Sequence, residues 1–266
     1  MNHTPNAPPL ERKPFETEPR QVPLDAPWNW LAAGWRDLWQ APSIGLLYGA
    51  IIAAGAFGFS VFLLKFGALS LLLALAGGFF LVAPLFAVGL YETSRRLAMG
   101  QSITIIDSLL AGRGAKIQLA LLGVVLTLIF IVWLQLAFVL SALFLGGGQL
   151  PQPSEFLQAL LFTTNGIALL IVGTFVGAVL AGVVFALSTV SVPMLLDRRI
   201  DLHTACSASL KATLRNPRPM ALWASLIVVM MAAGFVTLFI GLVVAFPLIG
   251  HATWHAYQDI YGEGSR

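Results

Sequence analysis

Residues 117–145 read IQLALLGVVLTLIFIVWLQLAFVLSALFL and contain no Asp, Glu, Lys or Arg. A helix that crosses the hydrocarbon core of a bilayer, which is roughly 30 Å thick, needs about 20 apolar residues at about 1.5 Å per residue. The stretch exceeds that length and is followed by a segment rich in Gly and Pro, so it predicts one membrane-spanning helix.

Four more uncharged stretches flank this helix, at residues 38–64, 66–91, 156–196 and 219–258. Polar residues at 163–166 interrupt the third stretch and would leave 156–162 as a short interfacial or re-entrant piece. The fourth stretch is too long for one helix, and we expect a turn near Gly234 to divide it. The sequence therefore predicts an all-α bundle of six spans, at residues 44–64, 68–90, 117–145, 167–196, 220–233 and 235–258.

Charged residues make up only 10% of the 266 residues, whereas apolar residues make up 58%. Soluble domains contain roughly 25% charged residues, so this composition excludes an ordinary soluble protein and indicates a polytopic membrane protein. Residues 1–24 contain six prolines and no apolar run, which predicts a disordered cytosolic tail. The rest of the chain divides into a membrane domain at 25–261 and a short C-terminal tail at 262–266.

The basic residues are distributed asymmetrically. Fourteen of the 15 Lys and Arg residues fall in segments on one side of the predicted membrane, and Lys65 alone falls on the other. Because cytoplasmic loops carry an excess of Lys and Arg, this distribution predicts both termini in the cytoplasm. The basic residues form no dense stripe, so nucleic acid is not an expected partner. The single cysteine, Cys206, excludes an intrachain disulfide.

One sequence pattern occurs twice, each time before a pair of predicted spans. Its order is apolar, basic, two variable, apolar, two variable, Pro, at residues 35–42 and 210–217, with a weaker counterpart at 103–110. The pattern favours three pseudo-repeated units, each an interfacial amphipathic helix followed by a hairpin. The alternative is that Trp, Pro and basic residues recur at any membrane boundary. In the first unit, an apolar stripe in the headgroup plane is expected to consist of Trp28, Leu31, Trp35, Leu38 and Trp39.

Ionisable residues recur four or eight positions after a proline near the cytosolic end of the second span of each unit. The prolines are Pro84, Pro193 and Pro247. Pseudosymmetry would bring the ionisable residues together at the inner membrane face. The predicted inner-face cluster consists of Glu92, Arg95, Arg96, Asp197, Arg198, Arg199, Asp201, His251 and His255.

Two interpretations of this cluster remain open. Carboxylate and imidazole groups can bind a divalent metal or haem iron, and His251 and His255 share one helical face at i, i+4 spacing. The metal candidates are His251, His255, Glu92, Asp197 and Asp201. The alternative, which we favour, is that the acidic and basic side chains pair with each other at the membrane interface, and no cofactor is then expected.

The sequence contains no recognisable catalytic motif. Residues 251–255 have the spacing of a zinc-protease helix, but Ala252 stands where the general base should be. There is no GxSxG, P-loop or dinucleotide-binding pattern, so we predict that the protein is not an enzyme.

The predicted spans also lack an ionisable residue near the midplane, which argues against ion-coupled transport. Gln135 is the candidate intramembrane polar site, either lining a passive pathway or making an interhelical hydrogen bond.

Small residues recur every four positions in two spans and let helices approach closely. They are Gly45, Gly49 and Ala53, and Gly173, Gly177 and Ala181. The stripes favour packing within one chain, with the seam of a homo-oligomer as the alternative.

Several strings at the span ends are distinctive: APLFAVGLYETSRR at 83–96, SVPMLLDRRID at 191–201, Asn216 followed by Pro217, and PLIGHATWHAY at 247–257. Together, over about residues 28–257, they resemble the domain of unknown function twenty-one eighty-nine family of uncharacterised bacterial integral membrane proteins. The resemblance implies a six-span protein of the bacterial inner membrane and no established activity, cofactor or catalytic residue. Some relatives are labelled respiratory oxidase subunits, but such a core needs more spans and haem ligands than this chain has, which leaves only an accessory role.

The leading hypothesis is thus a non-enzymatic structural, accessory or partner-binding protein of the cytoplasmic membrane. Its expected partners are the lipid bilayer and a second copy or another membrane protein. The alternatives are a channel or uncoupled permease for small solutes, and a metal- or haem-binding accessory of a respiratory complex.

Overall fold

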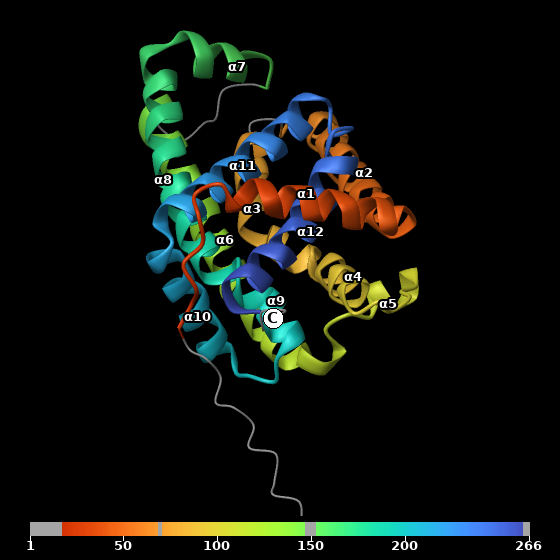
Figure 1. Cartoon of the computed structure of the whole chain (residues 1–266). Coiled ribbons are helices and arrows are strands. Elements are labelled where there is room, and N and C mark those ends of the chain that lie inside the picture. The colour runs from red at the N-terminus through yellow and green to blue at the C-terminus, as the bar shows by residue number, and fades with distance from the viewer. Residues whose placement is uncertain (1–17, 69–70, 147–152, 263–266) are drawn as a thin grey trace, which may run out of the picture.

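The computed structural model describes residues 18–68, 71–146 and 153–262, which form helices joined by turns, with no strand among them (Figure 1). The α-helices are α1 (Ala26–Gln40), α2 (Pro42–Lys65), α3 (Leu72–Phe86), α4 (Val88–Ala98), α5 (Ile105–Leu109), α6 (Lys116–Leu145), α7 (Pro153–Phe162), α8 (Thr164–Ser188), α9 (Ser191–Asp197), α10 (Leu202–Arg215), α11 (Pro217–Val236) and α12 (Leu242–Tyr261), and the 3-10 helix η2 is Arg113–Ala115. The predicted all-α membrane bundle is confirmed.

Within the described residues, five segments are long and apolar enough to cross a membrane, and they correspond to the first five predicted spans. They are Pro42–Lys65, Leu72–Ala98, Ile105–Leu145, Thr164–Asp197 and Pro217–Val236. The sixth predicted span corresponds to α12, whose second half carries His251, His255 and Asp259 and is therefore more polar than the other spans. This helix lies at the centre of the molecule, and its Trp254 and Tyr257 are almost fully buried.

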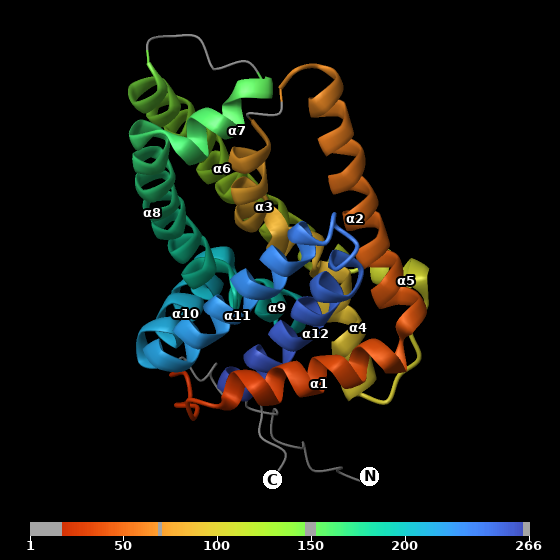
Figure 2. The same ribbon diagram turned by 90° about the horizontal axis from the view of Figure 1, so that it is seen from above.

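The hairpin of α11 and α12 reaches less far along the bundle than the other long helices. In Figure 2, α2, α3, α6 and α8 extend toward the end of the molecule that carries α7, whereas the turn between α11 and α12 lies well short of it. Leu238 and Phe239 make this turn with positive φ angles of 52° and 69°. The apolar side chains of Val236, Leu238 and Ile240 are 83%, 72% and 73% exposed there. The turn is thus apolar and exposed, and we propose that it lies within the bilayer, so that the hairpin is re-entrant.

Helix α1 crosses one end of the bundle, as expected of an interfacial helix (Figures 1 and 2). Its predicted apolar stripe is wrong in part, because Leu38 is fully buried while Trp28, Trp35 and Trp39 are exposed on the other side. The helix therefore has two apolar faces, one against the protein and one for lipid. Its buried face meets α12 closely, since a Cβ on Gly34 would stand 2.6 Å from the backbone nitrogen of Ala252.

Helices end near two of the three prolines. The helix containing Pro84 ends at Phe86 and α4 follows, α8 ends shortly before Pro193 in α9, and Pro247 lies within α12. Proline removes a backbone donor and disrupts a helix, which accounts for the boundaries near Pro84 and Pro193, whereas α12 continues through Pro247. Helix α4 packs against both α9 and the second half of α12. The segments after the prolines thus converge, as the three-unit pattern predicts.

The N-terminal segment before α1 is held against the end of the bundle. The Arg20 backbone N–H donates to Ile260 O at 3.0 Å, and the Val22 N–H donates to the Asn216 side chain at 2.9 Å. Residues 18–24 of the predicted disordered tail are therefore ordered, whereas residues 1–17 and 263–266 lie outside the described part. The described ends of the chain lie together at the end where α1 lies.

Candidate functional site

A cavity of about 1060 Å³ lies where α4, α5, η2 and α9 meet, and we call it the arginine-lined pocket. Apolar residues of α5 and α9 complete its wall. Its charged lining residues are Glu92, Arg95, Arg96, Asp107, Arg113, Asp197, Arg198, Arg199 and Asp201. Seven residues of the predicted inner-face cluster are thus brought together here, all except His251 and His255.

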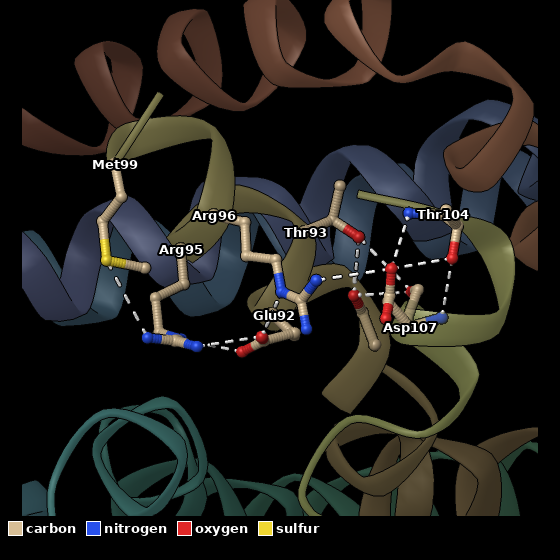
Figure 3. Close-up of polar contacts among 9 residues, drawn as sticks. Glu92, Thr93, Arg95, Arg96, Met99, Thr104 and Asp107 are labelled. Atoms are coloured by element: carbon tan, nitrogen blue, oxygen red, sulfur yellow. Dashed lines mark hydrogen bonds and ion pairs between the residues drawn. The ribbon is translucent and has the colours of Figure 1, made fainter. Parts of the chain in front are cut away.

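Glu92 organises the α4 side of the pocket. Its carboxylate accepts hydrogen bonds from Arg95 Nε at 2.7 Å and from Arg96 Nε at 2.8 Å, as Figure 3 shows. These residues are three and four positions apart on α4, the spacing at which side chains on a helix meet. Glu92 is itself 6% exposed, so both cations compensate a nearly buried charge.

Helix α5 closes the pocket beside α4. Thr104 caps α5 by accepting from the Asp107 N–H at 3.1 Å, while the Asp107 carboxylate accepts in return from the Thr104 N–H. The same carboxylate lies 3.4 Å from Arg96 Nη1 (Figure 3). Asp107 thus both starts the short helix and anchors it to α4.

The carboxylates on the α9 and α10 side also have partners. Asp197 accepts a 2.7 Å hydrogen bond from the Tyr257 hydroxyl, which in turn accepts one from Arg198 Nε at 3.0 Å. Asp201 caps α10 by accepting from the Thr204 hydroxyl and backbone N–H. These hydrogen bonds hold the pKa of Asp201 below its usual value, so its carboxylate is ionised at neutral pH.

Arg113 and Arg199 are the unneutralised charges of the pocket. Both are exposed, and among the described residues neither has a hydrogen bond or ion pair. Five guanidinium groups line the pocket against four carboxylates, which gives it a net charge of about +1. Since the four carboxylates already have hydrogen-bond partners, Arg113 and Arg199 are available to bind an anion.

His251 and His255 do not line the pocket but face α1 and α4. The His255 Nε2 atom lies 2.8 Å from the Asp37 carboxylate, which joins α12 to α1. His251 is fully buried, with Nδ1 2.8 Å from the Ser94 hydroxyl. Within the described residues, its Nε2 atom has no hydrogen-bond partner.

The five metal candidates therefore lie in separate contacts. Glu92 pairs with arginines, Asp197 with Tyr257, Asp201 with Thr204 and His255 with Asp37. Over residues 18–68, 71–146 and 153–262, no three His, Cys, Asp or Glu side chains gather as a metal ion would require.

Residues 71–197 match a family described as "Predicted integral membrane protein (DUF2189)". This region belongs to the DUF2189 family. No curated protein and no solved structure matches the chain significantly. The matched region is narrower than the predicted resemblance over 28–257, and it leaves out α1, α2, α10, α11 and α12.

The DUF2189 region supplies most of the arginine-lined pocket, from Glu92 on α4 to Asp197 on α9. Arg198, Arg199 and Asp201 follow directly after its end. The family description names no enzymatic activity, so it places the protein in a membrane without assigning a reaction.

Gln135 also lies in the DUF2189 region, but on the outer surface of α6, where its side chain is exposed. It lines neither the arginine-lined pocket nor the apolar groove of about 380 Å³ between α3, α6 and α8. Its amide therefore faces the surroundings of the bundle and not a pathway through it.

Three polar side chains of the pocket were not singled out as site residues by the sequence analysis. They are the charged residues Asp107 and Arg113, and Gln118. Gln118 accepts the Leu202 N–H at 3.0 Å and so joins the start of α6 to α10. The signal available in the sequence was the middle unit of the repeat, which places 103–118 at the same membrane face as the other two units.

Proposed function

We propose that the protein is a non-enzymatic accessory protein of the bacterial cytoplasmic membrane that binds a phosphate-bearing anion in the arginine-lined pocket. The observation that carries this proposal is that Arg113 and Arg199 line the cavity without a carboxylate partner among the described residues. Guanidinium groups present several fixed N–H donors that match phosphate oxygens, so two of them from different segments suit this ligand.

The arrangement of the other groups supports binding over catalysis. General acid–base chemistry needs a group that can exchange a proton with the substrate. Glu92 is bound by Arg95 and Arg96, and His251 is buried against Ser94. The pocket volume of about 1060 Å³ is near the upper end of ligand sites, roughly 300–1000 Å³.

The charge distribution supports a cytoplasmic position for the pocket and both termini. Arg20 and Ile260, near the two described ends of the chain, are hydrogen-bonded to each other. Fourteen of the 15 basic residues belong to segments expected on this side of the membrane, which is the bias of cytoplasmic loops.

The full-length chain in an uncharged detergent tests the proposal by calorimetric titration with inorganic phosphate. We expect binding that the double variant Arg113→Gln/Arg199→Gln loses. The matched control, Lys211→Gln/Arg218→Gln, removes two exposed positive charges outside the pocket and should bind like the unmodified chain. Equal binding by both variants, or no binding by the unmodified chain, would refute the proposal.

Association with another membrane helix is a second candidate function, favoured by the exposed Gln135 near the middle of α6. Lipid tails cannot hydrogen-bond an amide, whereas a second copy of this chain presents the same self-complementary group. We expect Gln135→Leu to weaken self-association in nanodiscs or liposomes by roughly fivefold, measured by energy transfer between labelled chains. Ser225→Ala is the control, because that exposed hydroxyl is already satisfied by Ala221 O at 2.8 Å.

A further inference from the structure

We infer that the anion bound in the arginine-lined pocket is the phosphodiester headgroup of an anionic phospholipid whose acyl chains lie along α5 and the start of α6. This inference rests on the proposed function and names its ligand class. It is carried by apolar residues that adjoin the charged ones, both inside the pocket and along its rim.

Part of the pocket wall is apolar. Four apolar side chains line the same cavity as the arginines. They are Leu110, just after α5, Leu195 and Leu196 on α9, and Ile200, just after α9. A small hydrophilic anion gains little from contact with leucine and isoleucine side chains. An amphipathic lipid buries its glycerol and first methylene groups against them, and each buried methylene contributes about 0.8 kcal/mol in general.

Helix α5 turns its apolar residues outward at the rim. Ile106 and Leu109 are 67% and 57% exposed, while Asp107 on the same helix faces Arg96 in the pocket and Ser108 is buried. A five-residue helix with this division lies with one side toward lipid and the other toward the charged pocket.

Helix α6 extends this apolar surface into the membrane. It begins at Lys116, three positions after Arg113, and then exposes Ile117, Leu121 and Val124 along one face. These positions follow the i, i+4, i+7 spacing of a single helix face. A phosphate held at Arg113 thus stands at the head of an apolar track, with exposed Lys116 beside it.

The place and charge of the pocket suit this ligand. Basic pockets between membrane helices on the cytoplasmic side bind anionic headgroups, and each basic residue near such a surface adds to the affinity. Arg113 comes from η2 and Arg199 from the segment between α9 and α10, so the two arginines reach the same cavity from separate parts of the chain.

Native mass spectrometry of the full-length chain tests the inference with three probes. They are phosphatidylglycerol, phosphatidylethanolamine with the same acyl chains, and the soluble deacylated headgroup glycerophosphoglycerol. We expect phosphatidylglycerol to bind best and Arg113→Gln/Arg199→Gln to weaken it by about thirtyfold, whereas Lys211→Gln/Arg218→Gln leaves it unchanged. The variant Ile106→Asn/Leu109→Asn changes only exposed apolar side chains, and it should weaken the lipid without affecting the soluble headgroup.

The outcomes separate this inference from the proposed function. If inorganic phosphate and the soluble headgroup bind through Arg113 and Arg199 as strongly as the lipid does, the lipid inference is overturned and the proposed function stands. Equal binding of the two lipids, or of the Ile106→Asn/Leu109→Asn variant and the unmodified chain, also overturns it. If no probe depends on Arg113 and Arg199, both proposals fail.

Discussion

Charged side chains in this protein pair with other side chains, both within one helix and between helices. Glu92 holds two arginines on one face of α4, Asp107 both caps α5 and meets Arg96, and Asp37 joins α1 to α12 through His255. A charge that is nearly buried needs a partner of this kind, because leaving it unpaired costs far more than the pair contributes. Arg113 and Arg199 differ from these residues, because neither has an ion pair or hydrogen bond among the residues that the structure describes.

The contact between Asp37 on α1 and His255 on α12 is expected to stabilise the protein. Asp37 is 7% exposed and lies 2.8 Å from His255 Nε2. Because a hydrogen bond involving a charged group contributes about 2 kcal/mol, we expect Asp37→Ala to lower the free energy of unfolding in detergent by that amount. Asp25→Ala is the control: Asp25 is exposed and makes no side-chain hydrogen bond at the start of α1. Equal stability of the two variants would contradict the role assigned to the pair.

The Asn216 side chain holds the segment before α1 against the bundle. Its buried side chain accepts from the Val22 N–H at 2.9 Å and donates to Arg20 O at 2.9 Å, which ties the segment before α1 to the junction of α10 and α11. Two lost hydrogen bonds of about 1 kcal/mol each should free this segment, so Asn216→Ala should speed amide exchange at Val22 at least about tenfold. Hydrogen exchange mass spectrometry checks this, with exposed Asn29→Ala as the control. Unchanged protection of residues 20–24 would show that other contacts hold the segment.

At the scale of elements, the small residues of α2 show how closely helices approach. A Cβ on Gly49 would stand 2.6 Å from the carbonyl carbon of Val243, so α2 rests directly on the backbone of α12. The stripe of Gly45, Gly49 and Ala53 therefore packs within the chain, as favoured from the sequence. In α8, Gly177 faces the Trp133 ring, whereas Gly173 borders open space.

A matched pair of substitutions in α2 tests this packing. Gly49→Ala should destabilise the protein by about 1 to 3 kcal/mol, because the added methyl group meets rigid backbone. Gly55→Ala lies on the same helix, where a Cβ meets nothing within 4 Å, and should stabilise the helix by about 0.5 to 1 kcal/mol. Thermal unfolding of the two variants in the same detergent measures the difference. If Gly49→Ala is as stable as Gly55→Ala, α2 and α12 do not approach in this way.

Helix positions were largely predictable from the sequence, whereas side-chain partners were not. Uncharged stretches define α2, α6 and α8 because lipid requires continuous apolar surface on a spanning helix. The repeat also predicted that segments after the prolines converge. The repeat placed Glu92 and His255 in one cluster, but Glu92 lines the pocket and His255 contacts Asp37 on α1. Sequence spacing does not determine how each helix is rotated about its own axis, so it could not distinguish the two. Arg113 was left out of the predicted cluster for another reason, because that cluster was defined by spacing from the three prolines and Arg113 follows none of them closely.

At the scale of the whole molecule, the four longest apolar segments form a frame, and the α11–α12 hairpin is inserted into it from the end that carries α1 (Figure 2). In this arrangement the polar second half of α12 lies toward the end of the molecule that carries α1. Both chain ends remain on one side whether the hairpin is re-entrant or complete, so the charge asymmetry of the loops could not distinguish the two. The depth of the α11–α12 turn in the membrane distinguishes a re-entrant hairpin from two complete spans.

Cysteine labelling measures that depth. In a Cys206→Ser background, single cysteines at Lys65, Gln101 and Leu238 would be exposed to a membrane-impermeant maleimide in intact cells and in inverted vesicles. We expect Lys65→Cys to react only from outside and Gln101→Cys only from inside, because Lys65 ends α2 and Gln101 follows α4, at opposite ends of the frame. Leu238→Cys should react from neither side despite being 72% exposed in the protein alone, since its turn would lie among lipid tails.

Denaturation in detergent should restore the labelling of Leu238→Cys, which shows that the thiol is present. Reaction of Leu238→Cys from outside would mean instead that α11 and α12 cross the whole bilayer, with the polar half of α12 at the inner face and six complete spans.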